Sequence, residues 1–255
     1  MDDILMVGPV DAEAELDRLA TRYRKAGGAG VKMLGALGGQ AEQLLDRLPS
    51  GMRDRLGDAT EYALTLAMRA AQGSRLAVPD QKPWVNTAMA TAMGAAGGFG
   101  GLPSALVELP ATTALLLRAI QGVAAENGFD PNEENVRFDC IRVLAAAGPL
   151  AHGDGGDLAF FTLRLTLTGG AVQKLIATVA PRLATALGQK LAAQTVPVLG
   201  AVAGATANYV YTSYYQEIAH VHFGLRRLAI DADIPHEDLV GQLAERMKKP
   251  PVKRA

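Results

Sequence analysis

Apolar residues recur at three- and four-residue steps along the N-terminal part of the chain, the spacing of one helix face. Between Asp11 and Gly27 the recurring positions are Leu16, Leu19, Tyr23 and Ala26. Similar runs cover residues 30–48 and 52–72, and Gly73 is placed to end the second of them. The pattern therefore predicts three amphipathic helices.

Two longer stretches lack charged side chains altogether, residues 83–107 and residues 191–216. Each is long enough to span a bilayer, since about 20 apolar residues suffice for a membrane helix. Polar residues such as Gln194 and Asn208 dilute the second stretch, which weakens the membrane interpretation. We therefore expect two hydrophobic helices and keep two alternatives open, burial inside the protein and burial in lipid.

Glycines spaced four residues apart occur in both uncharged stretches and once before them. The pairs are Gly35/Gly39, Gly94/Gly98, Gly97/Gly101 and Gly200/Gly204. Two glycines one turn apart let another helix backbone approach closely, in soluble bundles and in membranes alike. We expect close packing inside the domain, with lipid-embedded helix contact or self-association into a homo-oligomer as the alternatives.

Several residues around these glycines join them as candidates for helix packing or membrane contact. The full set is Gly94, Gly97, Gly98, Gly101, Pro197, Gly200, Gly204, Asn208 and Tyr209. Pro197 is predicted to open the last long helix, which runs to about Ile230. Tyr209 begins a tyrosine group at the end of the uncharged stretch, where an aromatic belt would meet a membrane interface. Tyrosines are equally common at the rim of a soluble core. The other members of the group are Tyr211, Tyr214 and Tyr215.

Proline and glycine mark most of the remaining boundaries. Pro103 sits where a helix could begin, and Pro110 is predicted to kink or restart it before Asn127-Gly128 ends it. A further helical run extends from Gly170 up to Pro181, and its period continues beyond that proline. A short terminal helix is predicted to follow the last long one.

A capping-box pattern supplies the clearest local signal. Asp130 is placed as the N-cap, Pro131 at the first helical position and Glu133 three residues after the cap. This arrangement predicts a helix over 131–147. Residues 161–168 alternate apolar and polar as a strand would, but we favour helix because a lone strand has no partner.

Together these elements predict an all-α protein, a compact multi-helix domain whose central hydrophobic helices are rich in Gly and Ala. We expect one helical domain over residues 12–245. Within it, residues 12–73 form an amphipathic part, residues 74–83 a linker and residues 84–245 a Gly-rich hydrophobic part. Residues 246–255 are expected to form a basic tail.

Composition supports the helical interpretation and limits the function. Hydrophobic residues make up 49% of the 255 residues but aromatic residues only 5%, a bias that suits helices better than sheets. A net charge of −1 gives no overall attraction to nucleic acid. Cys140 is the one cysteine, so an intrachain disulfide is impossible and a reducing compartment is expected. The N-terminus has no basic signal-peptide region, which indicates a cytoplasmic protein.

Two groups of residues have the chemistry of metal or proton-transfer sites. Glu217 and His220 lie one helical turn apart, as in di-iron carboxylate bundles, although such bundles need a second Glu-x-x-His. His152, Asp154 and Asp157 share a Gly-rich segment whose composition equally suits a solvated turn. We treat all five as weak metal candidates and expect neither a metal nor a cofactor.

Familiar catalytic motifs are missing from the sequence. It contains no Gly-x-Ser-x-Gly nucleophile turn, no His-Glu-x-x-His zinc helix and no Gly-x-x-x-x-Gly-Lys phosphate loop. Cys140 falls on a predicted amphipathic helix, where a cysteine is usually a core thiol. The catalytic residues, if the protein is an enzyme, stay unknown.

Two segments carry a resemblance to a known family. The first, residues 97–131, reads GGFGGLPSALVELPATTALLLRAIQGVAAENGFDP, and the second, residues 189–228, reads QKLAAQTVPVLGAVAGATANYVYTSYYQEIAHVHFGLRRL. They resemble the two signature blocks of the EcsC family. The likeness extends over about residues 12–245. It implies an all-helical bacterial protein of a family named for an operon that also encodes an ABC transporter of the protein-secretion type. It implies no set of catalytic residues.

We therefore expect a non-enzymatic accessory protein, cytoplasmic and peripheral at the inner face of the membrane. Its partners would be membrane lipid or a membrane protein such as the ABC transporter. The hydrophobic helix pair of residues 84–125 and 197–223 would be sheltered by the amphipathic helices of residues 12–72 or released from them. The alternative is a hydrolase or metal-dependent enzyme built on the five candidates above.

Overall fold

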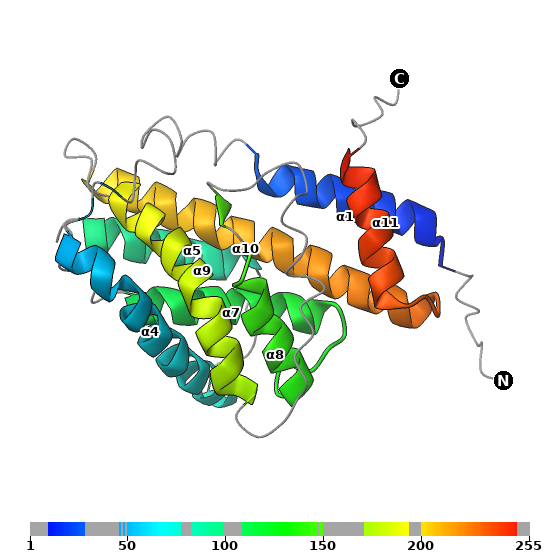
Figure 1. Ribbon diagram of the computed structural model, residues 1–255, viewed down its shortest axis with the longest axis horizontal. Coiled ribbons are helices and arrows are strands. Elements are labelled where there is room, and N and C mark those ends of the chain that lie inside the picture. The colour runs from blue at the N-terminus through cyan, green and yellow to red at the C-terminus, as the bar shows by residue number, and fades with distance from the viewer. Residues whose placement is uncertain are drawn as a thin grey trace.

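The computed structural model of the chain describes residues 10–28, 46, 48, 50–77, 83–98, 109–146, 148–149, 171–193 and 200–248. Within these residues the protein consists of eight α-helices with no strand (Figure 1). The helices are α1 (Ala12–Ala26), α4 (Ser50–Ala77), α5 (Pro83–Gly98), α7 (Leu109–Glu126), α8 (Glu134–Val143), α9 (Ala171–Ala193), α10 (Gly200–Asp231) and α11 (His236–Lys248). The prediction of a compact all-α fold is confirmed.

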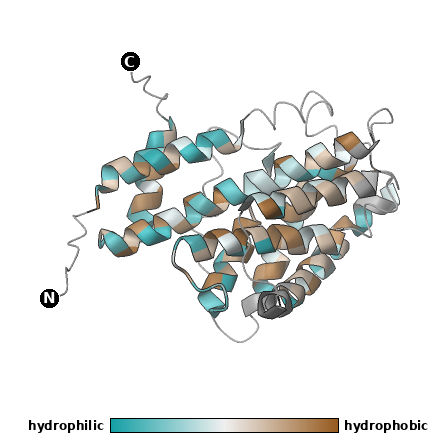
Figure 2. Cartoon of the chain, turned by 180° about the vertical axis from the view of Figure 1, so that it is seen from behind, coloured by the Kyte–Doolittle hydropathy of each residue, from teal (hydrophilic) through white to brown (hydrophobic). Residues whose placement is uncertain are grey.

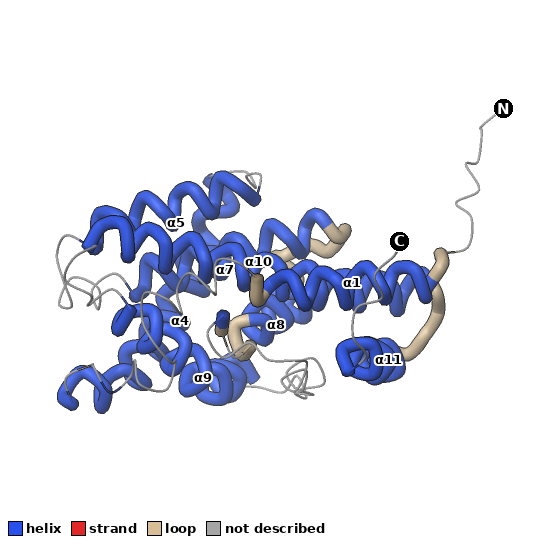
Figure 3. The backbone as a smooth tube through the Cα atoms, turned by 90° about the horizontal axis from the view of Figure 1, so that it is seen from above, coloured by secondary structure: helices blue, strands red, loops and turns tan. Residues whose placement is uncertain are grey.

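The longest helix, α10, organises the arrangement. It has 32 residues and runs along the length of the bundle (Figure 1). Helix α5 packs along its first half, whereas α1 and α11 pack against its second half. Helices α7, α8 and α9 also contact α10, and α4 packs on α7 and α9. Figure 3 places α5 at one edge of the bundle, on the side away from α9.

Helix α1 shows how the sequence pattern becomes packing. The Asp11 side chain accepts a hydrogen bond from the Ala14 backbone N–H at 3.1 Å, which caps the helix. The predicted apolar face is buried as expected, and Leu19 fits against Gly224 of α10. A Cβ atom at Gly224 would lie only 2.6 Å from Leu19 Cδ2. Glycine at this position therefore makes room for α1.

Helix α4 differs from its predicted bounds. It begins at Ser50 and continues through Gly73 to Ala77, so the predicted stop and the first part of the predicted 74–83 linker are wrong. Helix α5 already begins at Pro83. A glycine inside a helix costs about 1 kcal/mol, which tertiary packing readily outweighs. The predicted helix over 30–48 and the alternating segment 161–168 lie outside the described residues, apart from Asp46 and Leu48.

The middle of the chain confirms one boundary and corrects another. Helix α7 begins at Leu109, next to the predicted kink or restart at Pro110, and it ends as predicted before Asn127 and Gly128; the φ of Gly128 is +80°. The helix predicted over 131–147 is shorter, from Glu134 to Val143.

The capping box predicted from Asp130 does not form. The Asp130 side chain accepts a hydrogen bond from the Asn132 backbone N–H at 2.9 Å, two residues on, so it closes a turn ahead of the helix. Glu133 occupies the N-cap position without a side-chain hydrogen bond to the cap. Local competition between a turn and a cap explains the difference.

The C-terminal helix also extends further than predicted. Arg246, assigned to the basic tail, lies inside α11. Its guanidinium pairs with Asp17 at 3.0 Å and with Glu13, both on α1. The Arg24 guanidinium in turn donates a hydrogen bond to the Arg246 carbonyl. Arg246 thus joins the two ends of the chain, and residues 249–255 lie outside the described residues.

Helix α9 passes through Pro181 without interruption. The proline is on the exposed side, while apolar residues before and after it are buried on one face. These residues are Leu175, Ile176, Val179, Leu183 and Leu187. Their burial maintains the helix although proline removes one backbone hydrogen bond.

Replacing Pro181 with Ala should therefore stabilise the protein by about 1–3 kcal/mol, because proline is about 3 kcal/mol worse than alanine inside a helix. Chemical denaturation measures the change. Pro110→Ala is the matched control: Pro110 is the second residue of α7, where a proline is tolerated, so its replacement should have little effect. An unchanged stability in Pro181→Ala would contradict the interpretation.

Candidate functional site

Helices α5 and α10 approach each other closely at Gly94. A Cβ atom at Gly94 would lie 2.2 Å from the Gly204 carbonyl oxygen and 2.6 Å from Asn208 Nδ2. No side chain fits at that distance, so the two backbones meet through glycine. Gly97 and Gly98 end α5 and Gly200 begins α10, whereas Gly101 and Pro197 lie outside the described residues.

Buried hydrogen bonds run along the same contact. Asn208 Nδ2 donates to the Ala90 carbonyl at 2.7 Å, and Thr87 Oγ1 lies 2.9 Å from Gln216 Oε1. All of these groups are buried. A buried polar group costs free energy unless it is hydrogen-bonded, so each bond favours one register between the helices. We call this contact, from Thr87 to Gly94 on α5 and from Gly204 to Gln216 on α10, the polar seam.

The opposite side of α5 is apolar and faces solvent. Trp84 is 67% exposed and Met89 is 50% exposed, while the polar residues Asn86 and Thr87 are buried. A helix on the surface of a soluble protein normally shows the reverse order, with charged residues outside. Residues 83–98 contain no charged residue at all. We call this side the outward face of α5. Its exposed members are Trp84, Ala88, Met89 and Ala92.

A matching stripe occurs on the first half of α10. Val202 is 61% exposed and Tyr209 is 51% exposed, and half-buried small residues separate them. The predicted tyrosine group is divided: Tyr209 faces outward, whereas the other three tyrosines are buried in the core. Figure 2 shows brown and white colours across much of the bundle and more teal at the end formed by α1 and α11. The outward face of α5 and the stripe on α10 thus lie outside the most hydrophilic part of the molecule, the end formed by α1 and α11.

The predicted Glu217 and His220 pair has structural partners. Glu217 accepts a hydrogen bond from Arg22 Nε of α1 at 2.5 Å. His220 Nε2 lies 3.8 Å from Glu126 Oε2, yet burial and the nearby Arg22 and Arg18 lower the pKa of His220 to about 4. The imidazole is therefore neutral at physiological pH.

No group of three His, Cys, Asp or Glu residues suited to a metal ion occurs among the described residues. His152, Asp154 and Asp157 lie outside them. Cys140 is fully buried in the core. The described chain therefore offers helix surfaces, and not a cluster of reactive groups, as its candidate site.

One charged cluster was missed by sequence reasoning. Asp139 of α8 lies 2.7 Å from Arg226 Nη1, 3.3 Å from Arg142 Nη1 and 3.4 Å from His222 Nε2. Burial raises the pKa of Asp139, but the His222 hydrogen bond and the charges of His222, Arg142 and Arg226 outweigh it, so the pKa is lowered. Arg226 also stacks over the Phe129 ring at 4.5 Å. This cluster ties α8 to α10.

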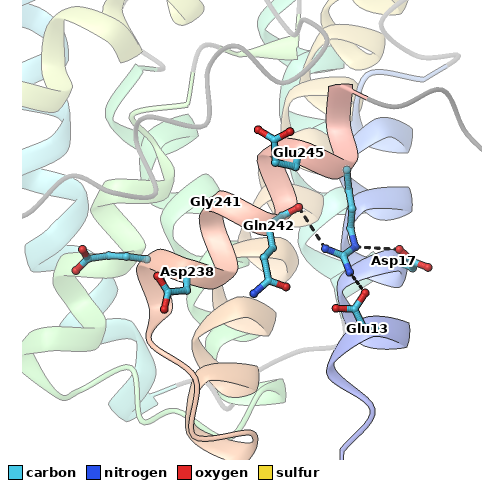
Figure 4. Close-up of a pocket in the computed structure, with 8 residues that line it drawn as sticks. Glu13, Asp17, Asp238, Gly241, Gln242 and Glu245 are labelled. Atoms are coloured by element: carbon cyan, nitrogen blue, oxygen red, sulfur yellow. Dashed lines mark hydrogen bonds and ion pairs between the residues drawn. The ribbon is translucent and has the colours of Figure 1, made fainter.

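An open acidic cleft lies between α1 and α11 (Figure 4). Five carboxylates and one guanidinium line it, namely Glu13, Asp17, Glu237, Asp238, Glu245 and Arg246. The Arg246 guanidinium forms ion pairs with Glu13 and Asp17, which Figure 4 marks with dashed lines. The cleft thus contains the ion pairs that join α11 to α1.

Comparison with known proteins supports one relationship. Residues 75–228 match the family model described as EcsC protein family. The matched region contains all of α5, α7, α8 and α9 and most of α10, but neither α1 nor α11, so it is narrower than the likeness expected over residues 12–245. No curated protein matches the chain, and no solved structure matches it either.

The polar seam makes Gly94 sensitive to substitution. Gly94→Ala should lower the free energy of unfolding by about 1–3 kcal/mol, because the new methyl group must push α5 away from the Gly204 carbonyl. Gly57→Ala on α4 is the control, since nothing lies within 4 Å of its Cβ position. That change should be neutral or stabilising by up to about 1 kcal/mol. Equal effects in both variants, measured by urea unfolding, would refute the close contact.

Asp139→Asn should destabilise the protein by about 2–4 kcal/mol at neutral pH, because Arg226 and Arg142 lose a buried counter-charge. In the folded protein the pKa of Asp139 lies below its ordinary value of 3.8. The ionised carboxylate therefore stabilises the fold fully above about pH 4. The contribution is lost as the pH falls through the folded pKa. The difference in stability between wild type and Asp139→Asn should therefore shrink below about pH 4.

Asp231→Asn is the control for this cluster. Asp231 forms an exposed ion pair with Arg227, and such pairs contribute less than about 1 kcal/mol. A difference between wild type and Asp139→Asn that stays constant down to strongly acidic pH would contradict the assignment.

Proposed function

Because the chain belongs to the EcsC protein family and the matched region contains the α5–α10 contact, we propose that it is a non-enzymatic accessory protein that acts at a membrane surface. The outward face of α5 is the part that contacts the membrane. No described helix is long and apolar enough to cross a bilayer. The contact proposed is therefore with the surface of the membrane.

The inverted polarity of α5 carries this proposal. A helix that is apolar on every side normally lies inside a protein core or in lipid. Here Asn86 and Thr87 are inside the bundle, while Trp84 and Met89 are outside. Exposed apolar surface of this kind usually marks an interaction site. Tryptophan in particular favours the boundary between lipid and water.

The arrangement of the helices modifies the expected mechanism. Helix α4 covers α7, and α1 covers the second half of α10, so these amphipathic helices shelter part of the hydrophobic region. They leave Trp84 and Met89 exposed. Of the two expected alternatives, shelter and release, the exposure of Trp84 and Met89 favours display of the outward face of α5 in the folded protein. Membrane contact at α5 needs no opening of the bundle.

The family resemblance supports an ABC transporter as the membrane-protein partner. It also supports a position at the cytoplasmic face of the membrane. The enzyme alternative gains no support from the described contacts. Glu217 pairs with Arg22, and the low pKa of His220 leaves it neutral beside Glu126. Both residues serve the packing of α1 and α7 on α10.

Cell fractionation tests the proposal. Wild-type protein should be found with the membranes and should be released by a carbonate wash, as a peripheral protein is. Met89→Asp should move the protein to the soluble fraction, because a charge on the outward face opposes entry into the lipid interface. Its melting temperature should stay close to that of wild type, since Met89 is half exposed.

Tyr62→Asp provides the matched control. Tyr62 is 62% exposed on α4, away from α5, so its replacement adds the same charge without touching the proposed surface. Its distribution should equal that of wild type. Wild-type protein found wholly in the soluble fraction, or Met89→Asp retained on membranes, would overturn the proposed function.

A further inference from the structure

We infer that the ligand of the outward face of α5 is an electrically neutral, loosely packed bilayer surface, recognised through its exposed acyl chains and not through anionic headgroups. This inference rests on the proposed function and names the lipid class. It follows from the charge, the side-chain sizes and the dimensions of the α5–α10 pair.

The α5–α10 pair is uncharged where its apolar surface lies. Neither α5 nor the first 17 residues of α10, up to Gln216, contain a charged residue. Attraction to anionic lipid comes from Lys and Arg near the surface, at about 1 kcal/mol for each residue. The exposed residues of the outward face therefore include no basic side chain that could select anionic headgroups, and they complement an uncharged layer.

The outward face of α5 combines large and small side chains. Besides its two large anchors, Trp84 and Met89, the exposed residues that the structure describes on this face are Ala88 and Ala92. Small side chains gain little from displacing tightly packed lipid. Binding of such a helix depends on gaps between headgroups, which is why interfacial helices are sensitive to membrane curvature and composition. A strongly curved bilayer offers more of these gaps.

Dimensions favour lipid over a second copy of the chain. At 1.5 Å per residue, the 16 residues of α5 span about 24 Å, and one helix face is about 10 Å wide. The resulting footprint of about 240 Å² is well below the roughly 800 Å² that each partner buries in a stable protein interface. The stripe on α10 would about double this area, which is still too small. A bilayer imposes no such minimum.

The polar seam lets α5 bind while it remains packed on α10. The Asn208 and Thr87 hydrogen bonds are already made within the protein. Separating the two helices in lipid would leave these groups without partners, at a cost in free energy. The folded pair therefore presents its outward face directly.

Trp84 reports on the contact because it is the one tryptophan in the chain. The experiment mixes the purified full chain with phosphatidylcholine vesicles, small sonicated or large extruded, with and without phosphatidylserine, at low and high salt. Trp84 emission and quenching by brominated phosphatidylcholine measure contact with acyl chains, and flotation measures the bound fraction.

We expect a blue shift and quenching with neutral sonicated vesicles, and several-fold weaker binding to large vesicles. Added phosphatidylserine or salt should change the partition coefficient by less than about twofold, whereas each basic residue engaged with anionic lipid would be worth about fivefold. Met89→Asp should bind about tenfold more weakly, and Tyr62→Asp should bind like wild type.

The other outcomes separate the two proposals. Binding that requires phosphatidylserine and is lost in high salt would overturn the inference but leave membrane contact intact. An absence of binding to every vesicle would overturn the proposed function as well. A concentration-dependent dimer that shifts Trp84 emission without vesicles would make a second copy the occupant and overturn the inference.

Discussion

The contact of the Gly94 region with the Gly204 carbonyl is the constraint on which the rest of this structure depends. Because no side chain separates the helices there, α5 and α10 approach until their polar side chains can bond across the contact. Asn208 then reaches the Ala90 carbonyl. Because those polar groups point into the bundle, the opposite side of α5, which includes Trp84, faces outward to solvent or to lipid. Close packing and an apolar exterior are thus two consequences of one geometry.

Much of the helical architecture could be predicted from sequence because it depends on periodicity. The buried face of α1 and the end of α7 before Asn127 and Gly128 follow from residues that are neighbours in the chain. The errors occurred where a local signal was weak or where two local signals competed. Helix α4 continues through Gly73, because one glycine costs a helix only about 1 kcal/mol. Asp130 closes a turn where a cap was expected, because its side chain accepts the hydrogen bond from the Asn132 N–H.

The candidate site was harder to predict than the fold. The glycine spacing indicated close approach, and the structure places Gly94 against Gly204, but spacing alone does not identify which helices meet. Helix α5 has no charged residue to mark a solvent-facing side, so periodicity does not indicate which side faces out, and the exposure of Trp84 could not be foreseen. The cluster around Asp139 joins residues more than 80 positions apart, as the Arg226 bond shows. No local pattern encodes such a contact.

The ion pairs of Arg246 link Asp17 to a helix 229 positions later in the chain. Both helices, α1 and α11, lie outside the region shared with the family, and both pack on α10. They form a separate layer assembled from the two extremities of the polypeptide. Loss of either helix would remove the ion-pair partners of the other, although each would keep its contact with α10. The stability of each of these two helices in the fold therefore depends in part on the other.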